Sequence, residues 1–358
     1  MKKRGKILFI KIEAKNNYDF GFKLGSRLKK QIKDRLDKNK DMYRKRAKKR
    51  KDFSVYIKKA KKFIPSIKKN FPHLYEEVKG MAEGSNIPLE KLLILMCDEE
   101  LVEFKWGSPR PLKLTRKPLR CTSIAIKTYN GEILMGHNED WWPEYRNNGL
   151  FLVDGKIKNN RFLAVGFMGN LAGSAFGMNK YGISYTDTSL EFKRFEYKVP
   201  RFFHLRALLD LKDLKDAIKV LDKEGSIVGN TLLISNSNIL DIEELTSKER
   251  VFHSNEWFVH TNHPLIRTDW NSYNVEKESM DRYNKVVELL HKEKKLNLGS
   301  LKKILRHHGA GICGHFTKNK PATYSITLAS AIFNPKEKWM MLCDTNPCKG
   351  KYKKYKLK

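Results

Sequence analysis

Alternating apolar and polar residues mark the middle of the chain as a succession of β-strands. The run 121–126 alternates in this way and is followed by the pair Asn130-Gly131 and by a second extended run that ends at Asp140. Because Asn-Gly tolerates the positive φ angles of a tight primed turn, the two runs predict a β-hairpin. The first residue of one antiparallel strand lies close to the last residue of its partner. We therefore expect Cys121 and Asp140 to lie at the same end of the sheet.

The same patterns predict helices and strands elsewhere in the chain. The N-terminal third is predicted to be helical. Strands are expected within residues 162–166, 174–188, 231–234, 239–245 and 257–261, helices within 202–223, 277–292 and 299–307, and a final hairpin within 323–344. The order helices, strands, helices, strands suits two stacked sheets covered by helices on both outer faces, an α+β class. We expect one composite domain, with a helical segment 1–120 packed on a core formed by 121–358.

Composition adds a strongly basic surface to this picture. The 358 residues include 72 Lys and Arg against 40 Asp and Glu, a formal net charge of +32. The densest basic block, residues 44–51, keeps open an alternative role as a protein that binds RNA or another polyanion, although such runs are usually a solvated face. No apolar stretch is long enough for a membrane span, and the apolar run near residue 1 is too short for a signal peptide. We expect a cytoplasmic protein without a membrane partner.

The five cysteines form no pairing pattern, so reduced thiols are expected. His260 and His263 make an H-x-x-H pair, but it falls at a strand end, where helical convergence fails. Cys313 and His315 would share one face of an extended segment, yet no further ligands follow at the spacing of a zinc site. No metal and no cofactor are therefore predicted.

Cys121 is the candidate nucleophile. A thiol is mostly protonated near neutral pH and needs a base, yet no histidine lies in a cysteine-protease signature here. If Cys121 attacks the carbonyl of Arg120 and the resulting thioester is hydrolysed, the freed α-amine of Cys121, with a pKa near ~8, can accept the thiol proton. Asp140 would hold that amine. The alternatives are a small buried cysteine that opens a strand and an aspartate that caps a strand end.

Several segments resemble one family, the acyl-CoA:6-aminopenicillanic acid acyltransferases, which are self-processed N-terminal-nucleophile hydrolases and acyltransferases with an αββα fold. The strongest match joins Cys-Thr-Ser at 121–123 to Gly-His-Asn-Glu-Asp-Trp at 136–141. Further matches are the glycine-spaced segment 18–25, Pro-x-x-x-Glu-Glu through Gly-x-Ala-Glu-Gly at 72–84, Thr-Asn-His at 261–263, Ser-x-x-Arg at 279–282, and the closing segments 327–335 and 346–348.

The resemblance implies that Cys121 is nucleophile and base, that Asp140 orients its free amine, and that Asn262 donates to the oxyanion. Without the resemblance, Asn262 is equally well read as a turn residue before Pro264. Two departures stand out. Gly314 occupies the position of an arginine in the family's Ile-Cys-Arg-His element, which leaves open whether His315 or a lysine supplies the cation. Asp-Thr stands where members often show Gly-Asn, within 185–190.

Together these features predict a cysteine N-terminal-nucleophile amidohydrolase or acyltransferase that acts on a small N-acyl or amide substrate. Acyl transfer to water and to an amine share one acyl-enzyme, so both remain open, and an acyl-CoA remains open as co-substrate. The expected partners are a small-molecule amide or acyl donor and, after cleavage at the Arg120–Cys121 bond, the two fragments themselves. The alternative is a non-catalytic relative that uses its basic surface to bind RNA or another polyanion.

Overall fold

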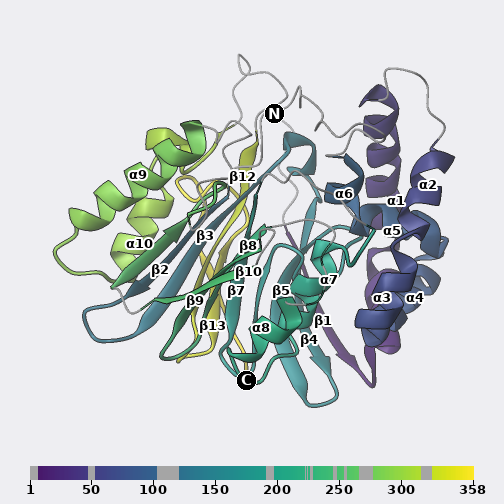
Figure 1. The fold of residues 1–358 in the computed structure, drawn as a ribbon, viewed down its shortest axis with the longest axis horizontal. Helices are drawn as coiled ribbons and strands as arrows, with labels where there is room; N and C mark the ends of the chain where they lie inside the picture. The colour runs from purple at the N-terminus through teal and green to yellow at the C-terminus, as the bar shows by residue number, and fades with distance from the viewer. Residues whose placement is uncertain are drawn as a thin grey trace.

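Two β-sheets form the centre of the protein (Figure 1). The computed structural model describes residues 7–46, 53–102, 121–190, 197–221, 223, 225, 229–244, 248–253, 256–265, 277–315 and 325–358. The eight-stranded sheet has the order β1 (Leu8–Ala14), β4 (Leu150–Ile157), β5 (Asn160–Phe167), β6 (Phe176–Asn179), β7 (Ser184–Ser189), β8 (Gly229–Ile234), β9 (Ile239–Glu244) and β10 (Lys248–His253). The six-stranded sheet has the order β11 (Trp257–His260), β2 (Thr122–Lys127), β3 (Ile133–Trp141), β12 (Ile326–Asn334), β13 (Trp339–Cys343) and β14 (Lys353–Lys356).

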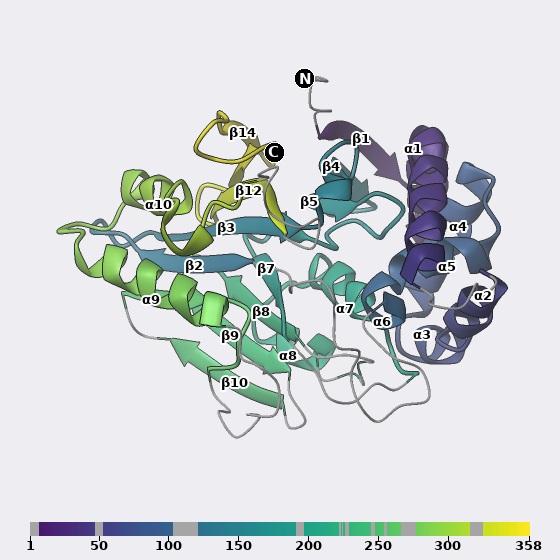
Figure 2. The same cartoon turned by 90° about the horizontal axis from the view of Figure 1, so that it is seen from above.

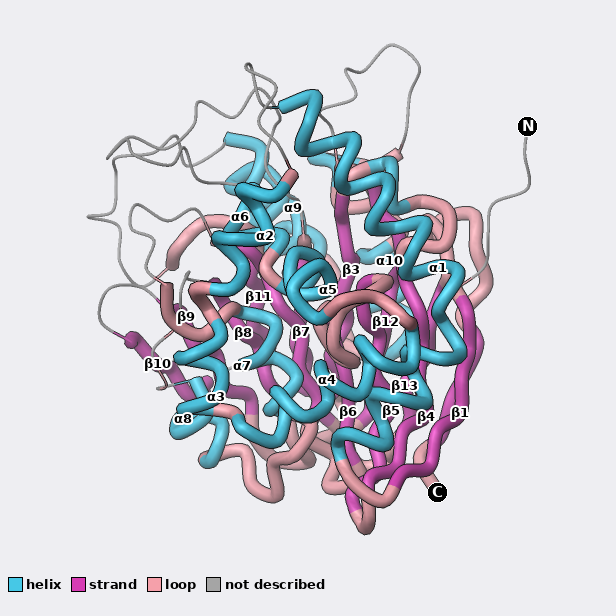
Figure 3. Tube along the Cα trace, turned by 90° about the vertical axis from the view of Figure 1, so that its right-hand side faces the viewer, coloured by secondary structure: helices cyan, strands magenta, loops and turns pink. Residues whose placement is uncertain are grey.

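Helices cover the outer faces of both sheets. One group comprises α1 (Asn17–Arg46), α2 (Ser54–Lys61), α3 (Ile64–Asn70), α4 (Pro72–Ser85), α5 (Leu89–Met96), α6 (Asp98–Val102), α7 (Arg201–Leu208) and α8 (Asp216–Leu221). The other comprises α9 (Lys277–His291) and α10 (Leu298–Leu305), and short 3-10 turns η1 (Pro143–Tyr145) and η2 (Gly309–Gly311) complete the described elements. Figure 3 shows helices of the first group in front of the eight-stranded sheet, and Figure 2 shows α9 and α10 at the opposite end of the molecule.

Strand alternation explains the layers, because successive side chains point to opposite faces. Ile124 and Ile126 of β2 pack in a cluster with Leu301 and Leu305 of α10. Ala125, between them, belongs to the larger core that joins the two sheets and the first helix group. The predicted four-layer αββα sandwich is confirmed.

The N-terminal third departs in part from the predicted helical segment. Its first element is β1, which pairs in parallel with β4, Leu8 opposite Phe151 and Ala14 opposite Ile157. Local alternation did not reveal this strand because its partner lies about 140 residues further along the chain. The prediction of an all-helical segment 1–120 is therefore wrong at 8–14, whereas the helices that follow are as expected.

The glycine spacing noted near residues 18–25 and 80–84 has a packing reason. A Cβ on Gly21 would lie 1.9 Å from the carbonyl oxygen of Glu77, and one on Gly80 would lie 2.0 Å from that of Tyr18. Only glycine lets α1 and α4 approach so closely. The two motifs thus form one helix–helix contact.

The hairpin of β2 and β3 is confirmed, with Gly131 at a φ of +82° in its turn. The helices predicted within 202–223, 277–292 and 299–307 are present, as is the final hairpin of β12 and β13. Residues 47–51 of the basic block, like Arg120, lie outside the described residues. Within the described ranges, no helix is both long enough and apolar enough to cross a membrane.

Candidate active site

Cys121 lies immediately before β2 and is only 2% exposed. The hairpin pairs Thr122 with Asn138 and Ser123 with His137, so the register continues to Cys121 beside Glu139. The Cys121 Sγ lies 3.7 Å from Glu139 Oε1 and 3.7 Å from the backbone carbonyl oxygen of Asp140. The predicted meeting of the thiol with the end of the partner strand is present, but the nearest carboxyl group is that of Glu139.

A small cavity between the two sheets reaches this thiol. Three carboxyl-bearing residues and three aromatic residues contribute to its lining, which consists of Glu99, Cys121, Glu139, Trp141, Phe167, Ser174, Ala175, Asp187, Ser189 and Phe202. Trp141 and Phe167 pack with tilted rings whose centroids are 4.8 Å apart, and the Phe202 ring centroid lies 6.0 Å from that of Phe167. The cavity thus combines an apolar wall with a set of acidic groups around one thiol.

The environment of the thiol in the uncut chain opposes its ionisation. Burial raises the pKa of Cys121 well above its ordinary value, and the charges of Glu139, Asp140 and Asp187 raise it further, against a lowering by the Asp140 backbone contact. A thiolate in this setting would need a compensating positive charge. These effects favour the neutral thiol in the intact chain.

Glu139 begins a chain of hydrogen bonds that leads away from the cavity. Its Oε2 lies 3.1 Å from His137 Nε2, and His137 Nδ1 lies 2.9 Å from Ser123 Oγ. Burial lowers the pKa of His137 to about 3, while burial and the Asp187 charge raise the pKa of Glu139 well above its ordinary value. Both directions favour neutral forms, so this contact is a hydrogen bond rather than an ion pair. Thr186 Oγ1 donates to Ser123 Oγ at 2.9 Å and completes the chain.

Asp140 lies on the other face of β3, as alternation requires. Its neighbour on that face, Asn138, donates to the carbonyl oxygens of Leu305 and Ile312 at 2.9 and 2.7 Å. The Asp140 Oδ2 is 3.5 Å from the point that a Cβ on Gly314 would occupy. An arginine at position 314 would thus begin its side chain beside the Asp140 carboxylate.

Asn262 lies two residues beyond the end of β11. His260, the last residue of that strand, pairs with Ser123 in antiparallel register. The Asn262 Nδ2 donates to the carbonyl oxygen of Ser189 at 2.9 Å, and Ser189 lines the cavity. Its Oδ1 accepts from Arg282 Nη2 at 2.6 Å, which fixes the amide with its N–H donors toward Ser189.

Two buried arginines that we did not predict as site residues bring positive charge to this region. Arg201 of α7 donates from Nε to Asp187 Oδ1 at 3.1 Å, and its Nη2 also contacts that carboxylate. Arg282 of α9 is 1% exposed and contacts Asn262 as described. The Ser-x-x-Arg motif signalled Arg282, whereas nothing local distinguished Arg201 or Glu139 from structural residues.

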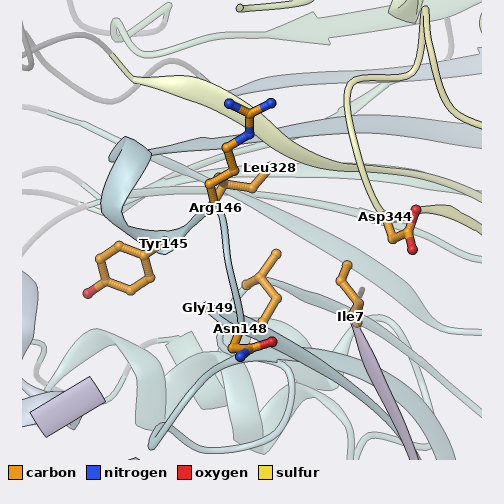
Figure 4. Close-up of a pocket in the computed structure, with 8 residues that line it drawn as sticks. Ile7, Tyr145, Arg146, Asn148, Gly149, Leu328 and Asp344 are labelled. Carbon is orange, nitrogen blue, oxygen red and sulfur yellow. The ribbon is translucent and has the colours of Figure 1, made fainter. Parts of the chain in front are cut away.

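A second hollow lies away from the thiol (Figure 4). Ile7, Tyr145, Arg146, Asn148, Gly149, Leu150, Leu328 and Asp344 line it. It contains no thiol and no serine or threonine hydroxyl, so the cavity at Cys121 is the better candidate for acyl chemistry.

Comparison with known proteins agrees with the resemblance seen in the motifs. Residues 126–349 match the family acyl-coenzyme A:6-aminopenicillanic acid acyl-transferase. The chain belongs to this acyltransferase family. The matched range contains Asp140, Asn262, Arg282 and Gly314, and it begins five residues after Cys121.

Two curated relatives of the acyltransferase-family chain match over part of their length. A β-alanyl-dopamine/carcinine hydrolase of Drosophila melanogaster is 30% identical over 45% of this chain and 44% of its own. An acyl-coenzyme A:6-aminopenicillanic-acid-acyltransferase (40 kDa form) of Emericella nidulans is 23% identical over 56% of this chain and 54% of its own. The matches thus span about half the length of each relative.

Among solved structures, an N-acylethanolamine-hydrolyzing acid amidase ortholog of Caenorhabditis elegans is similar at a TM-score of 0.46 and 15% identity. The match covers 66% of this chain and 100% of the amidase chain. A penicillin V acylase from Agrobacterium tumefaciens gives a TM-score of 0.43 at 13% identity, with 63% of this chain and 83% of that one covered. The roles of Cys121, Asp140 and Asn262 within the acyltransferase family fold remain predictions.

Proposed function

We propose that this protein is a cysteine N-terminal-nucleophile amidohydrolase or acyltransferase that matures by cutting its own Arg120–Cys121 bond. The observation that supports this most is the position of Cys121, a buried thiol at the head of β2 that lines a cavity in a chain of the acyltransferase family. Because the pKa of this thiol is raised in the uncut chain, the thiol needs a base that self-cleavage would supply. A new α-amine at Cys121 would add both a base and a positive charge among the nearby acids.

Maturation would begin when Cys121 Sγ attacks the carbonyl carbon of Arg120. The C–N bond breaks, the nitrogen leaves as the free amine with the thiol proton, and Arg120 is left as a thioester on Cys121. Water then hydrolyses that thioester, which releases the Arg120 carboxylate and restores the thiol. The products are residues 1–120 and 121–358.

Turnover would use the same thiol on a substrate amide. The α-amine takes the Cys121 proton, Sγ attacks the amide carbonyl, and the negative charge on the former carbonyl oxygen meets the Asn262 Nδ2 donor. The protonated amine then passes its proton to the leaving amine, and an acyl thioester remains. Water or a second amine attacks that thioester and regenerates the enzyme.

The cavity favours small amides with an apolar part, because Trp141, Phe167 and Phe202 contribute to its lining. The names of the two curated relatives suggest β-alanyl-dopamine, carcinine and 6-aminopenicillanic acid with an acyl-CoA as first probes. The high net charge also suits an anionic acyl-CoA at the surface.

Intact-mass measurement tests the proposal. The wild-type chain is expected to give fragments 1–120 and 121–358, whereas Cys121→Ala stays whole. Cys97→Ala, which removes another buried thiol, is the matched control and should still cut. A wild-type chain that remains uncut and resists thiol alkylation at residue 121 would contradict self-processing. A cut chain that turns over none of the amides in the probe set, and forms no acyl adduct with them, would contradict only the proposed substrates.

A further inference from the structure

A second group of reactive side chains lies outside the Cys121 cavity. It comprises His308 after α10, Cys313 and His315 after η2, and Cys348 in the turn between β13 and β14. One nitrogen or sulfur atom from each lies within 4.8 Å of all the others. Two thiols and two imidazoles from two distant segments therefore converge on one point.

The spacing of these atoms fits a tetrahedral metal ion. Zn–S bonds of about 2.3 Å and Zn–N bonds of about 2.05 Å place tetrahedral ligands about 3.8 Å apart for S–S, 3.3 Å for N–N and 3.6 Å for S–N. The Sγ atoms of Cys313 and Cys348 are 3.6 Å apart, and the Nε2 atoms of His308 and His315 are 3.2 Å apart. His315 Nε2 is 3.5 Å from Cys313 Sγ and 3.2 Å from Cys348 Sγ.

Hydrogen bonding alone accounts poorly for this arrangement. His315 Nε2 has three close neighbours, the two thiols and the Nε2 of His308, although an imidazole nitrogen offers one donor or one acceptor. A disulfide accounts for it no better, because a bonded pair of sulfurs would be about 2.05 Å apart. An ion at the centre would give all four atoms the same partner.

We propose that His308, Cys313, His315 and Cys348 form a Cys2His2 site for a structural zinc ion. This donor set in a tetrahedron is typical of zinc, and four protein ligands leave no open position for a substrate. The proposal replaces the expectation of no metal. The linear spacing misled us because the fourth ligand, Cys348, lies 35 residues after Cys313 and arrives from the turn after β13.

The surroundings support such a site. Asn346 Nδ2 lies 3.9 Å from Cys313 Sγ and donates to the Gly314 carbonyl oxygen at 2.5 Å. The Gly314 N–H donates to Thr327 Oγ1 at 2.8 Å, so both sides of the ligand segment are held. His308 is exposed, which gives an ion access from solvent.

The ion would fasten the turn between β13 and β14 to the segment after α10. Two thiolates balance the double positive charge of zinc, so the site would be neutral and would not replace the missing arginine. It would instead fix Gly314, which lies between two ligands and beside the Asp140 carboxylate. Loss of the ion should therefore loosen the segment that passes the Asp140 carboxylate without changing the local charge.

Elemental analysis of the purified chain tests the proposal, together with the absorption of the cobalt-substituted protein. We expect about one zinc per chain and a thiolate-to-cobalt band. Cys348→Ala and His308→Ala should each lose at least nine-tenths of the metal. Cys121→Ala and Cys97→Ala are matched controls that should keep it.

Three outcomes would overturn the proposal. The first is a folded wild-type chain that takes up no zinc or cobalt after reduction and metal addition. The second is a Cys313–Cys348 disulfide, seen as a mass 2 Da lower, in protein purified with a reductant. The third is metal that survives Cys348→Ala and disappears in Cys121→Ala, which would place it at Cys121, His137 and Glu139. Circular dichroism separates metal loss from unfolding, because a folded Cys348→Ala chain without metal supports the assignment directly.

Discussion

Replacing Arg282 with methionine should slow acyl transfer by releasing Asn262. Arg282 Nη2 donates to Asn262 Oδ1 at 2.6 Å in a buried setting. This bond leaves the amide N–H donors directed toward the carbonyl oxygen of Ser189, a residue that lines the cavity. Methionine keeps an unbranched apolar stem but cannot donate, so the Asn262 amide is free to rotate and offer its oxygen to the oxyanion instead.

The magnitude follows from the bond that is lost. A hydrogen bond to a charged group contributes about 1.5–3 kcal/mol. Each 1.36 kcal/mol is worth a factor of ten in rate, so Arg282→Met should lower kcat by about 10- to 150-fold. Asn262→Ala removes the donor itself and should cost about 100-fold or more. KM should change little in both variants, because the donor acts mainly on the charge of the transition state.

The assay is acyl-enzyme formation and turnover by the cut protein, with the best substrate of the amide probe set. Lys285→Met, on the same helix but paired with Glu288, is the matched control and should retain full activity. The decisive comparison is the double variant of Arg282 and Asn262, which should be no slower than Asn262→Ala alone. If Arg282→Met slows the Asn262→Ala chain by the same factor as the wild type, Arg282 does not act through Asn262.

Three further predictions concern groups buried near the site and in the core. Glu139→Gln in the uncut Cys121→Ala chain should raise the stability to urea at pH 8 and leave it unchanged at pH 4. The pKa of Glu139 is raised in the folded protein, so its neutral form stabilises the fold below the unfolded pKa of about 4.3, and this stabilisation is lost as pH rises. Equal stabilisation by the variant at both pH values would contradict this reasoning. The Cys121 thiol of the uncut chain should react with iodoacetamide far more slowly at pH 8 than a free cysteine, because its pKa is raised. Its reactivity should rise after the chain is cut. An equally slow reaction after the cut would argue against the α-amine as the base. Arg206→Met should lower the free energy of unfolding by about 3–5 kcal/mol, because it removes the guanidinium that pairs with the buried Glu77 carboxylate. Two Arg206 nitrogens donate to that carboxylate at 3.1 and 2.9 Å. A loss below about 1 kcal/mol in urea titration would mean that the pair is not the buried contact described.

Local signals in the sequence were enough to place the hairpin that carries the candidate nucleophile. The hairpin, its Asn130-Gly131 turn and Cys121 at its head follow from alternation and turn chemistry within some twenty residues. We did not predict the contact between Glu139 and Cys121, because we paired Cys121 with Asp140, the last acidic residue of the motif. The pairing of Thr122 with Asn138 sets Glu139 opposite Cys121. A shift of one residue along a strand moves a side chain to the other face.

Features that depend on distant pairing were beyond reach. The β1 strand has its partner in β4, and Arg201 reaches Asp187 only once α7 is packed against the sheet. The convergence of Cys348 on Cys313 likewise depends on how the turn after β13 returns to η2. Each needs the tertiary structure, because no local periodicity encodes which remote segment lies alongside.

The parallel pairing of β1 with β4 bears on what a cut at Arg120 would leave behind. Seven residue pairs, from Leu8 with Phe151 to Ala14 with Ile157, join the two sides of that bond in one sheet. The buried contact of Glu77 with Arg206 joins them a second time. The N-terminal piece would thus remain as an integral subunit rather than leave as a discarded leader. Two separately expressed chains that begin at residues 1 and 121 should therefore associate and rebuild the same two-sheet fold, although no peptide bond ever linked them.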